Sequence, residues 1–172
     1  MKDWSFANAE RPRVPMLRYV LDVGVEKVIP ESNEMNLFLD TFDGNPTYTP
    51  QNEELYKEMK EWWAWCDKEL KPMIDLYKYG ENLKFNTELH VIHTAELQKL
   101  IQILEDRLST STYLVGETLT FADIAIIPFI RQIMRTREGE FDFTSYPRVE
   151  KWTDSVILTD WFQNVVMKKG NE

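Results

Sequence analysis

The sequence predicts a mainly α protein, in which an all-helical domain follows a small unit of two strands and one helix. From about residue 51 onward, apolar residues recur at intervals of three and four, which is the period of amphipathic helices. Before residue 43 the apolar runs are short and β-branched, as in strands. The turn-rich stretch 43–50 separates the two patterns. We therefore predict one domain over residues 1–43 and a second over residues 51–172.

The first domain is expected to contain a β-hairpin. Residues 14–20 and 25–29 read as short strands, and the intervening Asp-Val-Gly supplies a turn. Pro30 ends the second strand, and Glu31 and Ser32 then open an amphipathic helix. The apolar side of that helix comprises Met35, Leu37, Phe38, Leu39 and Phe42.

The second domain is expected to contain helices only. Residues 51–79 and 86–109 each read as a long helix, and Pro72 should bend or break the first. Residues 121–130 are apolar almost all round, which predicts a helix buried on every side. A further helix begins at Tyr146 and Pro147, with proline in the tolerated first turn. A last short helix begins near Trp161.

A capping box precedes the apolar helix. Residues 120–123 have the pattern Thr-x-x-Asp, in which the Thr120 hydroxyl can accept from a first-turn amide and the Asp123 carboxylate can reach back to the cap backbone. A carboxylate beside an apolar helix could also be a general acid. Capping explains the spacing better, and loss of a cap typically costs about 1 kcal/mol of stability.

The charge balance narrows the choice of partners. Lys and Arg total 20 against 29 Asp and Glu, a formal net charge of -9. Such a surface repels phosphate backbones and anionic lipid headgroups, so neither nucleic acid nor membrane insertion is expected. No apolar run approaches the roughly 20 residues that a membrane-spanning helix needs, and the first residues have no secretory signal pattern. A single cysteine fits a reducing compartment, so we expect a cytoplasmic protein or one of an organelle stroma or matrix.

Two other features of the sequence invite chemical assignments. Cys66 lies among tryptophans with no basic neighbour to activate it, so a buried, inert thiol is favoured over a nucleophile. His90 and His93 are three residues apart and could share a helix face. A metal site would need a third ligand at a suitable spacing, and none is evident, so no metal is expected.

The order of several short segments resembles a bacterial-type glutathione S-transferase-like family, over nearly the whole chain from about Arg11 onward. The helical part carries most of the resemblance, and the order of the segments makes it specific. The matching segments are residues 14–17 (Val-Pro-Met-Leu), 28–32 (Val-Ile-Pro-Glu-Ser), 113–116, 119–125, 128–131 and 146–152.

The resemblance implies a glutathione site in a thioredoxin-like domain. In the family, the Val-Pro pair carries a cis proline, and the valine backbone pairs with the cysteinyl part of glutathione. The Glu-Ser pair binds the γ-glutamyl group at a helix N-terminus, where amides attract a carboxylate. By resemblance, Val14 and Pro15 would frame the peptide part of glutathione, and Glu31 and Ser32 would hold its γ-glutamyl end.

The sequence also departs from the family. Members begin with a β-α-β unit that carries the catalytic Cys, Ser or Tyr, whereas only 10 residues precede Arg11 here. We therefore expect a partial thioredoxin-like β-β-α remnant, truncated at the N-terminus, before the transferase-like helical domain. A hairpin with one helix is marginal by itself, so a second copy or another protein partner is expected to cover it.

Two function classes follow. The first is a glutathione S-transferase-like protein that lacks the catalytic unit, retains part of a glutathione site and has weak or no transferase activity. The second is a non-catalytic scaffold that uses the helical domain as a subunit of a larger assembly.

Overall fold

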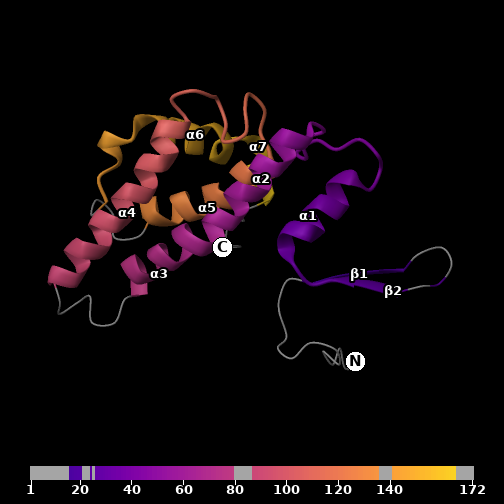
Figure 1. The fold of residues 1–172 in the computed structure, drawn as a ribbon, viewed down its shortest axis with the longest axis horizontal. Helices are drawn as coiled ribbons and strands as arrows, with labels where there is room; N and C mark the ends of the chain where they lie inside the picture. Colours follow the sequence, from indigo (N-terminus) through magenta and orange to yellow (C-terminus); the bar gives the residue numbers. More distant parts are fainter. Residues whose placement is uncertain (1–15, 21–23, 25, 80–86, 136–140, 166–172) are drawn as a thin grey trace. The chain divides into compact units, whose positions relative to one another are not determined.

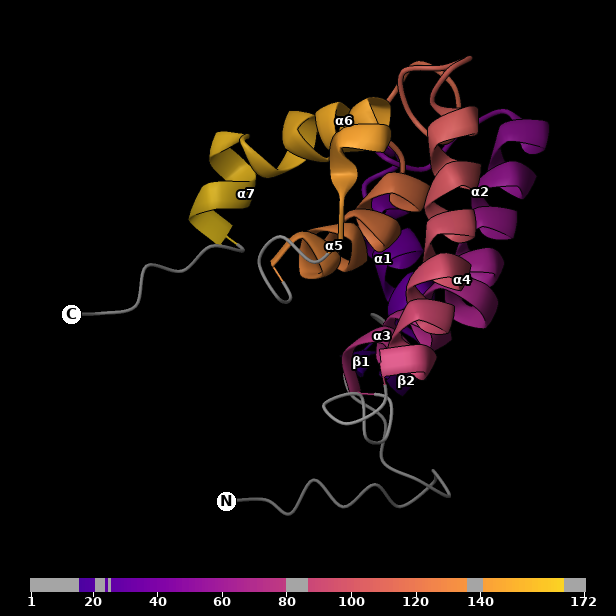
Figure 2. The same cartoon turned by 90° about the vertical axis from the view of Figure 1, so that its left-hand side faces the viewer.

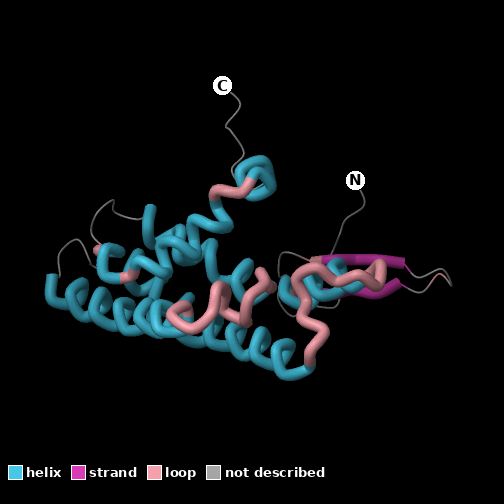
Figure 3. Tube along the Cα trace, turned by 90° about the horizontal axis from the view of Figure 1, so that it is seen from above, coloured by secondary structure: helices cyan, strands magenta, loops and turns pink. Residues whose placement is uncertain are grey.

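The computed structural model describes residues 16–20, 24, 26–79, 87–135 and 141–165, and it divides into two compact units, residues 1–49 and 50–172. Among the described residues, strands occur only in the first unit (Figure 1, Figure 3). The fold is mainly α, as the sequence predicts. Each unit is described by itself.

The first unit opens with the predicted hairpin. Strand β1 (Leu17–Val20) pairs antiparallel with β2 (Glu26–Ile29), so that Leu17 lies opposite Ile29 and Val20 opposite Glu26. Gly24 lies in the connection with φ of +76°, a conformation that glycine adopts without steric cost. The Arg18 guanidinium pairs with the Glu26 carboxylate across the hairpin.

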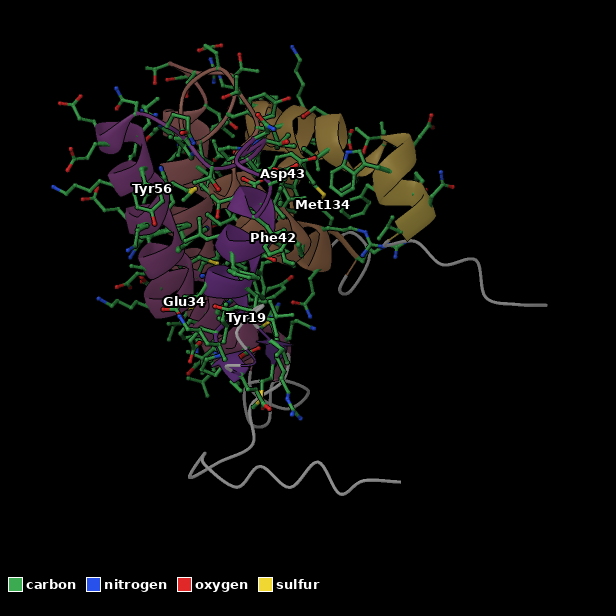
Figure 4. All side chains as sticks on the ribbon, turned by 90° about the vertical axis from the view of Figure 1, so that its right-hand side faces the viewer. Tyr19, Glu34, Phe42, Asp43, Tyr56 and Met134 are labelled. Atoms are coloured by element: carbon green, nitrogen blue, oxygen red, sulfur yellow. The ribbon has the colours of Figure 1, made fainter. Side chains whose placement is uncertain are left out.

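Helix α1 (Ser32–Thr41) packs on the hairpin through its middle. Met35 is buried, and the ring of Tyr19 in β1, which is labelled in Figure 4, stacks on Phe38 with centroids 4.4 Å apart. The predicted apolar side was too wide, because Leu39 is 60% exposed and Phe42 is 74% exposed. A ribbon of two strands covers only the part of the helix around Met35 and Phe38.

Asp40 organises the segment that follows α1. Its carboxylate accepts hydrogen bonds from the amides of Thr47 (3.0 Å), Tyr48 (3.1 Å) and Thr49 (2.9 Å), and from the Thr49 hydroxyl (2.7 Å). Burial alone would raise the pKa of Asp40, but these hydrogen bonds outweigh it and hold the pKa below its ordinary value. The loop is thereby drawn onto the helix, and the first unit extends to Thr49.

The second unit begins with a helical run that changes type in its middle. Helix α2 (Glu53–Trp65) is capped by Asn52, whose side chain accepts from the amides of Glu54 and Leu55. The π-helical segment η1 (Cys66–Leu70) leads into α3 (Lys71–Tyr79) without a break. The expected effect of Pro72 therefore takes the form of a π-turn directly before it. Proline has no N–H to donate and its ring crowds the preceding turn, and a wider turn accommodates both.

Helix α4 (Thr87–Arg107) packs against α3 and η1 and is the front helix of this unit in Figure 2. The helix lies within the predicted range 86–109, and Leu97, Ile101 and Leu104 form its fully buried stripe. The predicted helices after it are α5 (Phe121–Arg135), α6 (Pro147–Ile157) and α7 (Asp160–Val165), with a short 3₁₀ turn, η2 (Phe143–Ser145), before α6.

The prediction that the apolar helix is buried on every side was wrong. In α5, Ile126, Ile127 and Ile130 are fully buried, but Pro128 is exposed and Phe129 is half-buried. Proline inside a helix removes a backbone hydrogen bond. Because Pro128 has no N–H, the carbonyl group one turn earlier loses its usual donor. On an exposed face, water can donate to it instead.

Helix α4 also holds the start of α6 through a buried carboxylate. Glu105 is only 4% exposed, and its oxygens accept from the amides of Arg148 (3.0 Å) and Val149 (2.9 Å) and from the Arg148 guanidinium (2.9 Å). These amides belong to the first turn of α6, which has no partners for them within the helix. Glu105 therefore acts as a cap from outside the helix that it caps.

Two further polar contacts fix α2 in the unit. The Trp63 indole N–H donates to the Phe121 carbonyl oxygen at 2.9 Å, and Arg107 forms an ion pair with Glu58 at 2.8 Å. The tryptophan bond is buried, so it fixes the register of α2 against the start of α5. No helix in the described part of the chain is long and apolar enough to cross a membrane.

We predict that the loop after α1 opens only in strong acid. The lowered pKa of Asp40 means that its contribution is present above the ordinary carboxyl value of about 3.9 and is lost as the pH falls through the lower folded value. NMR titration of the Asp40 side-chain carboxyl carbon should give a lower midpoint in native protein than in concentrated urea. Equal midpoints, or a higher one in the native state, would contradict the assignment.

Candidate functional site

The N-terminus of α1 is the candidate binding site. Glu31 is its N-cap residue, with an extended backbone (φ -103°, ψ 128°), and Ser32 is the first residue of the helix. Both side chains are exposed, and the Glu31 carbonyl oxygen accepts from the Met35 amide at 3.0 Å. The first amides of a helix lack partners within it and attract anions. The end of α1 thus presents an acidic side chain, a hydroxyl and backbone donors together.

The predicted site combines the start of α1 with residues that precede β1, and the hairpin register bears on this combination. Because Leu17 lies opposite Ile29, the chain enters β1 at the same end of the hairpin where β2 leads into α1. Val14 and Pro15, the other predicted glutathione contacts, lie outside the described residues. The structure shows Glu31 and Ser32 at the start of α1. The roles of all four residues stay predictions.

The carboxylate of Asp123 is the centre of a buried polar cluster at the start of α5. Its Oδ2 accepts from the amide and the hydroxyl of Thr120, both at 2.9 Å, and the Thr120 hydroxyl in turn accepts from the Ala122 amide at 3.3 Å. Its Oδ1 accepts from the Leu114 amide and the Trp152 indole N–H, both at 2.9 Å. The side chain therefore links the α4–α5 loop, α5 and α6.

Sequence reasoning located Thr120 and Asp123 but missed the two distant partners. Leu114 and Trp152 are 9 and 29 residues from Asp123, so no helical spacing connects them. Burial raises the pKa of Asp123 above its ordinary value. The hydrogen bonds from Leu114, Thr120 and Trp152 lower it but do not outweigh burial. The residue is fully buried, and the four groups that contact its carboxylate in the described structure are all donors. A carboxylate closed off in this way has a structural role and no access to substrate.

The single cysteine is also closed off. Cys66 begins the π-turn and is 2% exposed. Burial raises the pKa of its thiol to about 12, with Lys71 lowering it and Asp67 raising it. The thiol is therefore protonated at neutral pH, and a protonated thiol is a poor nucleophile.

Comparison with known proteins identifies the family. The family model for the glutathione S-transferase C-terminal domain matches residues 72–165, more than half of the chain. The chain belongs to this family.

The curated relatives of this glutathione S-transferase family member match only a part of it. A probable glutathione S-transferase of rice (Oryza sativa subsp. japonica) is 37% identical over 62 residues, which are 36% of this chain and 28% of the relative. A disulfide-bond oxidoreductase of Escherichia coli (strain K12) is 32% identical over 103 residues, which are 56% of this chain and 44% of the relative. The matches thus span less than half of either relative.

Solved structures show the same fold over more of the chain. A glutathione transferase from Burkholderia graminis, solved with two glutathione molecules bound per subunit, has a TM-score of 0.73 and 19% identity, covering 87% of this chain and 64% of that one. A glutathione transferase family member from Pseudomonas fluorescens, with two glutathione bound, has a TM-score of 0.72 and 18% identity, covering 86% and 67%. At these identities the likeness establishes the fold.

The histidines of this transferase-like domain do not form a metal centre with other described residues. No group of three or more His, Cys, Asp or Glu in the described ranges could hold a metal ion. His90 instead stacks on Tyr77, with centroids 5.5 Å apart, and Tyr77 is fully buried and meets the edge of Phe141. Tyr77 is therefore a core residue that joins α3 to α4.

A depression of about 480 Å³ lies between the end of α4 and α6, and no feature of the sequence signalled it. The Ser109 and Thr110 hydroxyls on its wall donate to the Asp106 and Arg107 carbonyl oxygens, at 2.6 and 3.0 Å. These hydroxyl protons are already used in hydrogen bonds to the last carbonyl groups of α4. The lining consists of Leu108, Ser109, Thr110, Ser111, Thr112, Glu117, Arg148, Lys151, Trp152 and Ser155.

We predict that Asp123→Ala lowers the free energy of unfolding by about 2–4 kcal/mol, because it leaves buried donors from three segments unsatisfied. Urea unfolding followed by circular dichroism measures the loss. A double-mutant cycle with Trp152→Phe isolates the hydrogen bond from the indole to Asp123. The double variant should lose less free energy of unfolding than the sum of the two single variants. The matched control is Asp75→Ala, an exposed change on α3 that should stay within about 0.5 kcal/mol. Equal losses for Asp123→Ala and Asp75→Ala would contradict the assigned role.

Proposed function

We propose that this glutathione S-transferase-like protein binds glutathione at the N-terminus of α1. The Glu31 carboxylate holds the α-ammonium group of the γ-glutamyl end, and the Ser32 hydroxyl and first-turn amides receive its α-carboxylate. The observation that carries the proposal is the pair of exposed acidic and hydroxyl side chains at the start of a helix. Val14 and Pro15 complete the proposed site by framing the peptide part of the ligand.

The solved neighbours support this ligand. The Burkholderia graminis and Pseudomonas fluorescens proteins share the fold over more than four fifths of this chain, and both were solved with glutathione bound. Glutathione is a zwitterion at its γ-glutamyl end, and the α1 terminus offers complementary groups for both charges. The proposed site needs no metal.

We further propose that residues 1–172 have weak or no conjugating activity by themselves. Conjugation needs a group that stabilises the glutathione thiolate. In the family this residue is a Cys, Ser or Tyr, and Cys66, the only cysteine of the chain, is 2% exposed with the pKa of its thiol raised to about 12, so it cannot fill that role. Binding of glutathione without efficient turnover is the outcome that these features favour.

A second candidate function is that of a non-catalytic scaffold. Elongation factor 1-gamma of Artemia salina, a protein not named as a transferase, is 25% identical over 131 residues, which are 75% of this chain and 30% of the relative. The first unit also exposes Val20, Leu39 and Phe42 at 60–74%. In this reading a second copy or another protein, in the cytoplasm or an organelle stroma or matrix, covers that apolar surface.

Calorimetric titration with reduced glutathione tests the proposed ligand. We expect a dissociation constant in the micromolar-to-millimolar range. Glu31→Gln should weaken binding by about tenfold or more, because it removes the charge that meets the ligand ammonium. Glu34→Gln, in the same first turn and also exposed, is the matched control and should bind as the parent does.

The same titration separates the two candidate functions. No heat at millimolar glutathione would refute the ligand and favour the scaffold. Equal weakening by Glu31→Gln and Glu34→Gln would refute the assigned contact. Rapid turnover of glutathione with an aryl halide electrophile would refute the proposal of weak activity.

A further inference from the structure

The depression between the end of α4 and α6 is separate in the chain from the proposed glutathione contacts. Its volume of about 480 Å³ lies within the range of pockets that hold small ligands. Leu108 (8% exposed) and Trp152 (3% exposed) give it apolar surface, and every other side chain on its lining is polar or charged. A depression of this composition can hold an apolar group and several polar groups of one ligand.

Five hydroxyl groups line the depression, and each already donates its proton to an oxygen of the protein. They belong to Ser109, Thr110, Ser111, Thr112 and Ser155. The acceptors are, in the same order, the carbonyl oxygens of Asp106 (2.6 Å), Arg107 (3.0 Å) and Tyr113 (2.7 Å), the Glu117 carboxylate, and the Trp152 carbonyl oxygen (2.7 Å). A hydroxyl has one proton and two lone pairs, so these groups can offer a ligand acceptors only.

The donors for a ligand come from α6. Arg148 and Lys151 are three residues apart, so their side chains lie on one face of the helix. The buried Glu105 carboxylate pairs with Arg148 at 2.9 Å, which holds the guanidinium in place while 55% of the Arg148 side chain stays exposed. Lys151 is exposed, and no residue in the described part of the chain forms an ion pair with it. The α6 side therefore presents a fixed guanidinium and an ammonium that can still receive an anionic group.

The opposite charge comes from the α4–α5 loop. Glu117 is exposed there, and its carboxylate has about four acceptor positions, of which the Thr112 hydroxyl uses one. Inorganic phosphate fits poorly, because it would meet this carboxylate and hydroxyls that have no proton to give. A zwitterion fits both sides. Because the two charges come from different segments, a dipeptide, whose charges lie at opposite ends, fits better than a free amino acid, whose charges share one carbon atom.

We propose that this depression binds a short peptide with free termini, of dipeptide size. The C-terminal carboxylate of the peptide accepts from the Arg148 guanidinium and the Lys151 ammonium, and its N-terminal ammonium donates to the Glu117 carboxylate. An apolar side chain of the peptide lies against Leu108 and Trp152. The site goes beyond the proposed function, because all of its residues belong to the second unit. The charged groups are exposed, so each contact is weak and binding in the millimolar range is expected.

NMR titration of the full chain with glycyl-leucine tests the site. The Trp152 indole N–H gives a resonance of its own, and we expect it to shift together with the amides of residues 108–112. Lys151→Gln and Glu117→Gln should each weaken binding by about threefold or more, the size of one exposed charge pair. Both positions are exposed, and glutamine keeps an acceptor for the hydroxyl that Glu117 receives, so both variants should fold as the parent does.

Peptides blocked at one end show which terminus meets which residue. Glycyl-leucinamide lacks the carboxylate, so its affinity should not respond to Lys151→Gln. N-acetylglycyl-leucine lacks the ammonium, so its affinity should not respond to Glu117→Gln. Lys68→Gln and Glu69→Gln, at exposed positions of η1 outside the depression, are the matched controls and should bind glycyl-leucine as the parent does. Circular dichroism establishes that each variant is folded.

Three outcomes would overturn the proposal. The first is that neither the Trp152 indole nor the amides of residues 108–112 shift at about 50 mM glycyl-leucine. The second is that Lys151→Gln and Lys68→Gln weaken binding equally. The third is that N-acetylglycyl-leucine binds as tightly as glycyl-leucine, which would indicate a site for a simple anion. Because glutathione is titrated separately and its proposed contacts lie in the first unit, failure of this site and failure of the proposed function are distinguishable.

Discussion

The helical unit depends on one buried carboxylate. Asp123 lies at the start of α5, where it joins the backbone of the α4–α5 loop at Leu114 to the cap residue Thr120 and to the Trp152 indole of α6. Each of these donors would be costly if buried without a partner. Asp123 has a complete set of partners only when the loop, α5 and α6 are in place, so it connects the formation of all three. The backbone of Leu114 is also held at its carbonyl oxygen, which accepts from the Arg107 guanidinium at 2.9 Å.

A second carboxylate applies the same principle to α6. Glu105 reaches from α4 to the first amides of α6 and is itself only 4% exposed. Burying an ionised acid costs free energy unless its oxygens accept hydrogen bonds. Here both accept hydrogen bonds from surrounding donors: helix-end or loop amides, an indole, a hydroxyl and a guanidinium. Both carboxylates thus serve donors where helices begin, while Leu97, Ile101 and Ile127 are apolar residues that are fully buried within their helices.

The sequence was most informative about features that depend on one segment of the chain, such as the position of a helix or its cap. The 3.6-residue period located α4 within residues 86–109, and the Thr-x-x-Asp pattern located the start of α5 because the cap is a local interaction. Contacts between distant segments carry no such signal. Nothing in the spacing pairs Asp123 with Trp152, or Glu105 with α6. The apolar composition of residues 124–130 concealed the exposure of Pro128, since residue type alone does not show which face of a helix lacks a neighbour. In the first unit, the Glu31 and Ser32 positions follow from a proline stop and a helix start, whereas their ligand was inferred from family resemblance.

The π-turn between α2 and α3 has a consequence for how this chain can change over evolution. A π-turn holds about one residue more than an α-turn that joins the same two helical ends. Trp63 before it and Ile74 and Tyr77 after it are all buried, so both flanks face the core despite the extra residue. A deletion of one residue between Cys66 and Leu70 can therefore be absorbed locally, by conversion of the π-turn into an α-turn. This helical run contains a site at which its length can vary without its buried faces being rebuilt.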